Sequence, residues 1–257
     1  MTHGLKGKFV IVDGLDGIGK GVVVDTIANY LKTSGKRILN LRKYWEEFHD
    51  HPDFENKEFD GKPNKFYIDL DSFDVIISNE PTYAIIGRAI RYEIIAKNGR
   101  DYSVHFTAQS YSSDRLILYK RVILPALRAG KIILQERSFS TSIVFQSTQE
   151  GEDKMTVDEI LALEGNAFCL KNTPDLLIIP TIKDVEDVIK RLDRRAKDDN
   201  CEFENLDFQK KIKPLYESKE LRKIFEDRGT VVKYLDAGIS LEETKKQAIE
   251  IYKSIVK

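Results

Sequence analysis

Residues 9–21, with the sequence FVIVDGLDGIGKG, contain a glycine-rich loop of the kind that binds phosphate. An apolar run leads into the spacing G-x-x-x-x-G-K, in which backbone N–H groups and the lysine ammonium hold phosphate oxygens. The next segment, VVVDTIANYLKTSGK, is typical of a helix, and a helix N-terminus at the loop favours a bound anion. The residues predicted to bind phosphate are Gly14, Asp16, Gly17, Ile18, Gly19, Lys20 and Gly21.

The loop departs from the usual pattern at its last position. Gly21 stands where a Ser or Thr hydroxyl normally reaches Mg²⁺, and Val22 offers no hydroxyl either. A magnesium ion would therefore depend on phosphate oxygens, on water and on carboxylates. Asp13 and Glu136, each at the end of an apolar run, are the candidate metal-binding residues.

Six apolar runs alternate with segments of helical periodicity. The runs are KFVIVD, KRILNL, DVIISNE, KIILQE, DLLIIPTI and TVVKYLD, and the main helical segments are 106–129, 156–168, 185–196, 207–227 and 241–256. This alternation predicts an α/β fold, a parallel sheet with helices on both faces. Ligands of such sheets bind at the carboxyl ends of the strands, so residues 13–20, 79–80 and 136–137 and those after 181 should lie along one edge.

Composition limits the classes of partner. The 257 residues contain 41 Lys and Arg and 42 Asp and Glu, a net charge of −1 that predicts neither nucleic acid nor a membrane surface as partner. The first residues lack a signal-peptide pattern, and no apolar stretch is long enough to span a membrane. Cys169 and Cys201 fit neither a disulfide framework nor a zinc spacing. We therefore expect one cytoplasmic domain over residues 1–257 that acts on a small molecule.

Residues 44–74 interrupt the alternation and form a predicted insertion. The segment is acidic and aromatic with little helical or strand pattern, which predicts a long loop. His49 and His51 match no known metal spacing, and the aromatic residues Trp45, Phe48, Phe54 and Phe59 are expected to pack the loop onto the body of the protein.

The segments GLDGIGK, YSSDRLILYKRVILPALRAGKIILQERS and RLDRRAK follow one another along the chain. In this combination the chain resembles the thymidylate kinase family, which has an E-G-x-D-G-x-G-K loop, a D-R helix, a D-R-Y strand end and a basic lid. The likeness covers most of the chain outside residues 44–74. It implies a P-loop NTPase fold with a lid near residues 191–205, ATP and Mg²⁺ as cofactors, a homodimer, and the reaction of dTMP with ATP to give dTDP and ADP.

The resemblance also implies roles for acceptor-binding residues. Asp16 would hold the sugar 3′-hydroxyl, Tyr111 would stack on the pyrimidine, and Arg115 would bond to the base or its neighbours. Gln146 falls where the family has a glutamine near the base. Arg137 would bind the acceptor phosphate and neutralise charge during transfer.

Other basic residues would serve the transferring phosphates. Lys20 is assigned to the donor phosphates. Asn79 stands where the family usually has an arginine, and Arg88 or Arg91 would substitute for it. The lid residues would be Arg191, Arg194 and Arg195, of which the last two are assigned a catalytic role together with Lys20 and Arg137.

Two alternatives remain open from the sequence. The triplet ERS at 136–138, together with Glu80 and Pro81, also resembles the deoxynucleoside kinases, in which Glu80 would be the general base for a neutral 5′-hydroxyl. The other is a protein that binds nucleotide but has lost turnover. Gly21 supports that hypothesis, while the presence of both Lys20 and Arg137 argues against it.

Overall fold

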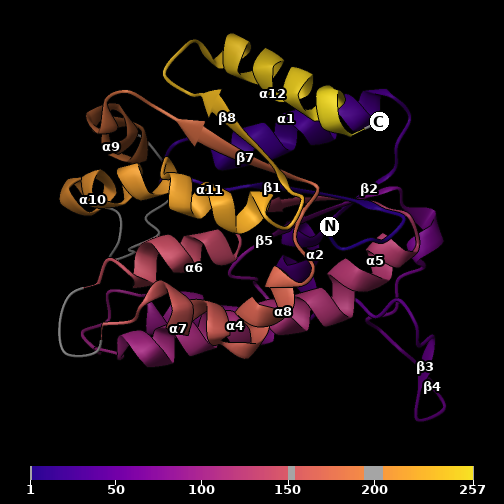
Figure 1. Ribbon diagram of the computed structural model, residues 1–257. Coiled ribbons are helices and arrows are strands. Elements are labelled where there is room, and N and C mark those ends of the chain that lie inside the picture. The colour runs from indigo at the N-terminus through magenta and orange to yellow at the C-terminus, as the bar shows by residue number, and fades with distance from the viewer. Residues whose placement is uncertain (1, 150–153, 194–204, 257) are drawn as a thin grey trace.

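A parallel sheet of six strands, in the order β2-β5-β6-β1-β7-β8, runs through the centre of the protein (Figure 1). The structure is a computed structural model that describes residues 2–149, 154–193 and 205–256. Each predicted apolar run forms one strand, which confirms the α/β fold class. The strands are β1 (Lys8–Val12), β2 (Ile38–Asn40), β5 (Val75–Asn79), β6 (Ile132–Glu136), β7 (Leu176–Thr181) and β8 (Val231–Asp236).

Strand β1 pairs with β6 on one side and with β7 on the other. Because all three strands are parallel, the residues that follow them meet at one edge of the sheet. Register places Val12 opposite both Glu136 and Ile178, so Asp13 and Arg137 leave the sheet side by side. The glycine loop that follows β1 is therefore next to the end of β6.

Helices cover both faces of the sheet. Helices α1 and α12 lie together on one face, and α4, α6, α8 and α11 lie on the other (Figure 1). The helices of the described residues are α1 (Lys20–Thr33), α2 (Leu41–Phe48), α3 (Ile85–Ala89), α4 (Val104–Leu118), α5 (Leu124–Arg128), α6 (Phe139–Gln146), α7 (Val157–Ala162), α8 (Glu164–Leu170), α9 (Val185–Asp193), α10 (Leu206–Tyr216), α11 (Lys219–Glu226) and α12 (Leu241–Ile255). None of them is long and apolar enough to cross a membrane.

Burial of the central strands on both faces explains why their sequences are continuous apolar runs. Residues Phe9–Val12 of β1 and Leu176–Ile179 of β7 are almost completely buried, because helices pack on both faces of these strands. A fully buried strand needs apolar side chains on both faces, and the sequence supplies them without alternation.

The prediction of a long loop for residues 44–74 is wrong in its first part. Helix α2 extends to Phe48, and a two-stranded hairpin joins β3 (Glu58–Phe59) to β4 (Lys62–Pro63). The helix has only eight residues, so packing of buried Leu41 and Trp45 and the cap at Asn40 stabilise it more than any long periodic pattern. Trp45 is buried as expected, whereas Phe59 is 71% exposed and does not pack on the body.

Candidate active site

The glycine loop between β1 and α1 curls around a lysine ammonium. Gly14, Gly17 and Gly19 all have positive φ, and a Cβ on Gly17 would lie only 2.6 Å from Leu192 Cγ, so larger residues would not fit there. Lys20 Nζ donates hydrogen bonds to the carbonyls of Gly14 at 3.1 Å and Leu15 at 2.7 Å. This is the geometry of a cradle for phosphate, closed by the first turn of α1.

A polar cavity of about 920 Å³ opens in front of the loop. It contains five cationic and five acidic side chains, so it suits a highly charged ligand. The residues that line it are Asp16, Gly17, Gly19, Lys20, Gly21, Val22, Asp25, Arg42, Trp45, Glu46, His49, Asn79, Glu80, Tyr83, Arg88, Arg91, Tyr92, Glu136 and Arg137.

Asp16 is paired with two cations at the base of this cavity. Arg137 donates to Asp16 Oδ1, and Lys20 Nζ lies 3.6 Å from the same oxygen. Burial disfavours the Asp16 carboxylate, but the charges of Arg137 and Lys20 outweigh it and lower its pKa. Burial and the charge of Arg137 lower the pKa of Lys20. The three side chains therefore form one cluster of paired charges at the base of the cavity.

Arg137 has an unusual backbone conformation. Its φ of 68° lies in the left-handed region, which non-glycine residues rarely adopt. The residue follows β6 directly, and its N–H donates to Val12 O at 2.9 Å. Strained backbone of this kind is characteristic of functional sites, and here it accompanies a side chain that lines the cavity.

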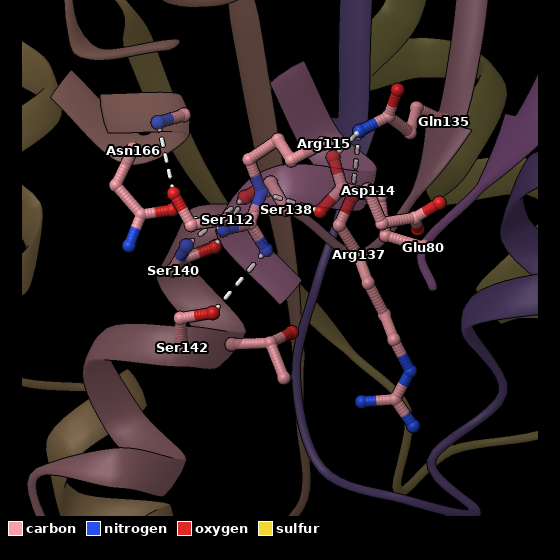
Figure 2. Close-up of polar contacts among 12 residues, drawn as sticks. Glu80, Ser112, Asp114, Arg115, Gln135, Arg137, Ser138, Ser140, Ser142 and Asn166 are labelled. Atoms are coloured by element: carbon pink, nitrogen blue, oxygen red, sulfur yellow. Dashed lines mark hydrogen bonds and ion pairs between the residues drawn. The ribbon is translucent and has the colours of Figure 1, made fainter. Parts of the chain in front are cut away.

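Arg115 lies in a buried network beneath the cavity. Its Nε donates to Glu80 Oε2 at 2.7 Å, and its other nitrogens donate to Asn166 Oδ1 and Ser142 Oγ. Figure 2 shows this cluster, with the Arg137 side chain extending away from it. Arg115 is 1% exposed and does not line the polar cavity.

Glu80 is the carboxylate partner in this network and reaches the cavity wall. Burial raises the pKa of Glu80 to about 7, against the lowering effect of Arg115. Its second oxygen accepts a hydrogen bond from Gln135 Nε2 at 2.9 Å. Both oxygens are therefore already bonded to protein donors.

The two predicted metal-binding carboxylates have different surroundings. Asp13 is 0% exposed and does not line the polar cavity, whereas Glu136 lines it with 23% of its side chain exposed. The donors to the Asp13 carboxylate are the N–H groups of Gly14 and Ser138 and the hydroxyls of Ser140, Thr141 and Tyr216. Glu136 therefore fits Mg²⁺ or its bound water, and Asp13 does not fit a direct ligand. Within the described ranges, no group of three or more His, Cys, Asp or Glu residues could hold a metal ion by itself.

A second cavity of about 340 Å³ lies on the other side of the glycine loop. Its wall is largely apolar, and it shares Gly17, Gly19 and Val22 with the polar cavity. Arg191 Nη2 donates to Ala237 O at 2.8 Å across this wall. The other lining residues are Ile18, Ile239, Leu241 and Thr244.

The remaining predicted residues lie apart from the two cavity walls. Tyr111 is half-buried on α4, and Gln146 is buried on α6. The Oε1 atom of Gln146 has no hydrogen-bond partner in the part of the chain that the structure describes. Arg194 and Arg195 lie outside the described residues, as does most of the predicted lid.

A set of cavity residues from α2 and from the residue that follows it was not predicted from the sequence as part of the site. Arg42, Trp45, Glu46 and His49 line the polar cavity. The sequence contained a signal for Arg42. This residue directly follows the apolar run KRILNL, just as Arg137 directly follows the run KIILQE. Applying the strand-end rule to that run would have identified Arg42.

The chain is similar to known proteins both in sequence and in fold. A family model described as "Thymidylate kinase" matches residues 65–248. A thymidylate kinase of Caldicellulosiruptor saccharolyticus is 28% identical over 233 residues, 88% of this chain and 91% of the relative. A probable thymidylate kinase of Pyrococcus abyssi is 24% identical over 254 residues, 97% of each chain. The structure of a Candida albicans thymidylate kinase matches with a TM-score of 0.63 and 16% identity, covering 97% of this chain and 92% of that one.

Proposed function

The chain belongs to the thymidylate kinase family, and from that premise we propose that it transfers the terminal phosphoryl group of ATP to dTMP, giving ADP and dTDP. One observation supports this most strongly. The phosphate-binding loop with Lys20 separates a polar, arginine-rich cavity from a largely apolar one. Such a division suits two nucleotides whose phosphates meet at the loop.

The donor would bind with its phosphates on the loop N–H groups and Lys20. Its adenine would enter the apolar cavity, where Ile18, Ile239 and Leu241 offer apolar contact. Arg191 lines the same cavity. Arg194 and Arg195 remain proposed lid residues that would close over the phosphates and exclude water.

The acceptor would occupy the polar cavity. Arg137 would hold the dTMP phosphate, with Arg88 as a further cation, and Asp16 would accept a hydrogen bond from the sugar 3′-hydroxyl. Tyr111 and Gln146 do not line this cavity, and their roles as base contacts are proposed from the family resemblance alone. Arg115 would serve the acceptor through Glu80, because each of its three guanidinium nitrogens donates a hydrogen bond within the buried network.

In the reaction, an oxygen of the dTMP phosphate attacks the γ-phosphorus of ATP, and the bond to the β–γ bridging oxygen breaks. The attacking phosphate is already ionised, so no general base is required, and the protein positions the groups and neutralises their charge. Lys20 and Arg137 supply this charge. Mg²⁺, bound beside Glu136 directly or through water, would neutralise the β- and γ-phosphates.

The nucleoside kinase alternative is not favoured. The relatives that match the chain are thymidylate kinases, whose ionised acceptor phosphate needs no general base, and both Glu80 oxygens accept hydrogen bonds within the protein, from Arg115 and Gln135. For assembly and location we propose a homodimer in the cytoplasm, as the family resemblance implies. The molar mass measured by light scattering tests the dimer.

The test is ADP release from MgATP with dTMP, dUMP, thymidine or deoxycytidine as acceptor. We expect turnover with dTMP and none above background with thymidine. Lys20→Met is the matched inactive control, because it keeps the length of the side chain and removes its charge. Turnover with thymidine but not dTMP would assign the base role to Glu80, and no turnover despite ATP binding would support a pure nucleotide binder.

A further inference from the structure

Arg42 is placed at the edge of the polar cavity by the short strand β2. Asn40 of β2 lies opposite Ile77 of β5, so Arg42 reaches the level of Asn79 at the carboxyl end of the sheet. Helix α2 begins at once, and the Asn40 side chain accepts a hydrogen bond from the Arg42 N–H at 3.0 Å. This cap fixes the first turn of α2, from which Arg42 lines the cavity.

The guanidinium of Arg42 has partners that a ligand can replace. It donates to Asp25 Oδ1 on α1, and its Nη1 lies 4.0 Å from Glu136 Oε2. The Asp25 side chain is 54% exposed, and ion pairs with such exposed carboxylates are weak. A phosphate dianion in the cavity would compete well for this guanidinium.

Gly21 leaves room for this arrangement. A Cβ on Gly21 would lie 3.3 Å from Glu136 Oε2 and 3.9 Å from Arg42 Nη1. A Cβ at this position, directly after Lys20, would make a tight contact with the Glu136 carboxylate and an ordinary van der Waals contact with the Arg42 guanidinium. Gly21, which lacks the usual loop hydroxyl, is thus also the residue of α1 that lies beside Glu136 and Arg42.

Three other cations in the cavity, Lys20, Arg91 and Arg137, are more firmly engaged, whereas Arg88 lies over the ring of Tyr92 at 5.9 Å, away from the glycine loop. Lys20 and Arg137 are both paired with the buried Asp16. Arg91 Nε donates to the carbonyl of Pro81, and its guanidinium lies 3.9 Å from the ring centre of Tyr83. Arg42 is the cation next to the glycine loop that is held by an exposed carboxylate.

We propose that Arg42 binds the terminal phosphates of the donor nucleotide. This inference rests on the proposed function for the identity of the donor, and it adds a phosphate-binding residue from α2. On binding, the guanidinium exchanges Asp25 for phosphate oxygens and neutralises charge at the end of the loop where Gly21 offers no hydroxyl. The planar guanidinium suits bidentate contact with phosphate.

The test is calorimetric binding of inorganic tripolyphosphate and of ATP, each with Mg²⁺ and without acceptor. We expect Arg42→Ala to raise both dissociation constants about tenfold or more, and Arg42→Lys to raise them less. Lys43→Ala is the matched control, since Lys43 is an exposed cation on the same helix and does not line the cavity. It should change both constants less than twofold. Unchanged binding by Arg42→Ala would overturn the proposal.

A second variant distinguishes two roles of Arg42, binding phosphate and holding α2 against α1 through its ion pair with Asp25. Asp25→Asn weakens the ion pair but leaves the guanidinium in place, so phosphate binding should be unchanged or tighter. If Arg42 only holds α2 in position, Asp25→Asn and Arg42→Ala will weaken binding equally and lower the melting temperature equally, which contradicts the proposal. Both assays omit the acceptor, so their results stand even if dTMP proves not to be the substrate.

Discussion

Two regions of the site differ in how their charged side chains are buried and paired. The floor, formed by Asp13, Glu80 and Arg115, is buried, and protein donors or acceptors surround each of its charges. The mouth, formed by Arg42, Glu136 and Arg137, lines the polar cavity with partly exposed side chains. The floor residues are bonded to partners within the protein, even Glu80, which reaches the cavity wall but is 2% exposed, whereas the mouth residues face the volume that a nucleotide would fill.

The difference shows why residue type alone does not identify a catalytic group. Arg115 and Arg137 each have a carboxylate partner, yet only Arg137 lines the cavity. Removing a mouth residue should therefore affect binding and catalysis, and removing a floor residue should affect stability first. Three substitutions test this difference.

The largest effect is expected from Arg137→Ala in the mouth. An arginine that neutralises the transferring phosphoryl group is worth about 10³–10⁵ in rate, so kcat should fall by about 10³ or more. The dissociation constant of ATP should change little, because Lys20 and the loop remain. Steady-state kinetics and calorimetry measure the two quantities. Arg128→Ala, an exposed arginine on α5, is the control, and wild-type kcat in Arg137→Ala would remove Arg137 from the reaction.

In the floor, Arg115→Leu should act on stability. Removing one partner of a buried ion pair leaves the Glu80 carboxylate uncompensated, which costs about 3–5 kcal/mol in the free energy of unfolding. Urea denaturation at pH 8 measures this loss, because without Arg115 the folded protein must either bury an unpaired Glu80 carboxylate or take up a proton there. Arg37→Leu, which breaks an exposed ion pair with Asp74, should change stability far less. Equal losses in the two variants would contradict the distinction between floor and exposed pairs.

The smallest effect concerns the packing that supports α2. His51 is 0% exposed, its ring nitrogens have no partner among the residues described, and it contacts Trp45 edge-on at 5.6 Å. Burial, together with the charge of Arg121, lowers the pKa of His51 to about 3.

The unfolded chain therefore binds a proton at His51 near pH 6.5, while the folded protein does not until about pH 3. Stability contributed by neutral His51 is present above pH 6.5 and falls as pH decreases, by up to about 1.4 kcal/mol per pH unit. His51→Phe lacks this dependence. Its stability relative to the wild type should rise from pH 7 to pH 5 in urea titrations, and a constant difference would show that His51 is accessible to protons.

The sequence predicted the strands and the glycine loop because both depend on local patterns. Buried parallel strands need continuous apolar runs, and a phosphate loop needs glycines at fixed spacing. The enclosure of Asp13 depends instead on Tyr216 of α10, some two hundred residues away, and the engagement of Arg115 depends on Asn166 of α8. No local pattern reports such contacts. Helix α2 was missed because it is short and is stabilised by tertiary packing of Leu41 and Trp45.

The most direct test of the contrast between floor and mouth is a crystal structure with a non-hydrolysable ATP analogue and dTMP bound. The account predicts guanidinium nitrogens of Arg42 and Arg137 within about 3.2 Å of phosphate oxygens, and Arg115 still bonded to Glu80. Arg42 still paired with Asp25 and clear of the phosphates, or Arg115 turned out of its network onto the nucleotide, would contradict it.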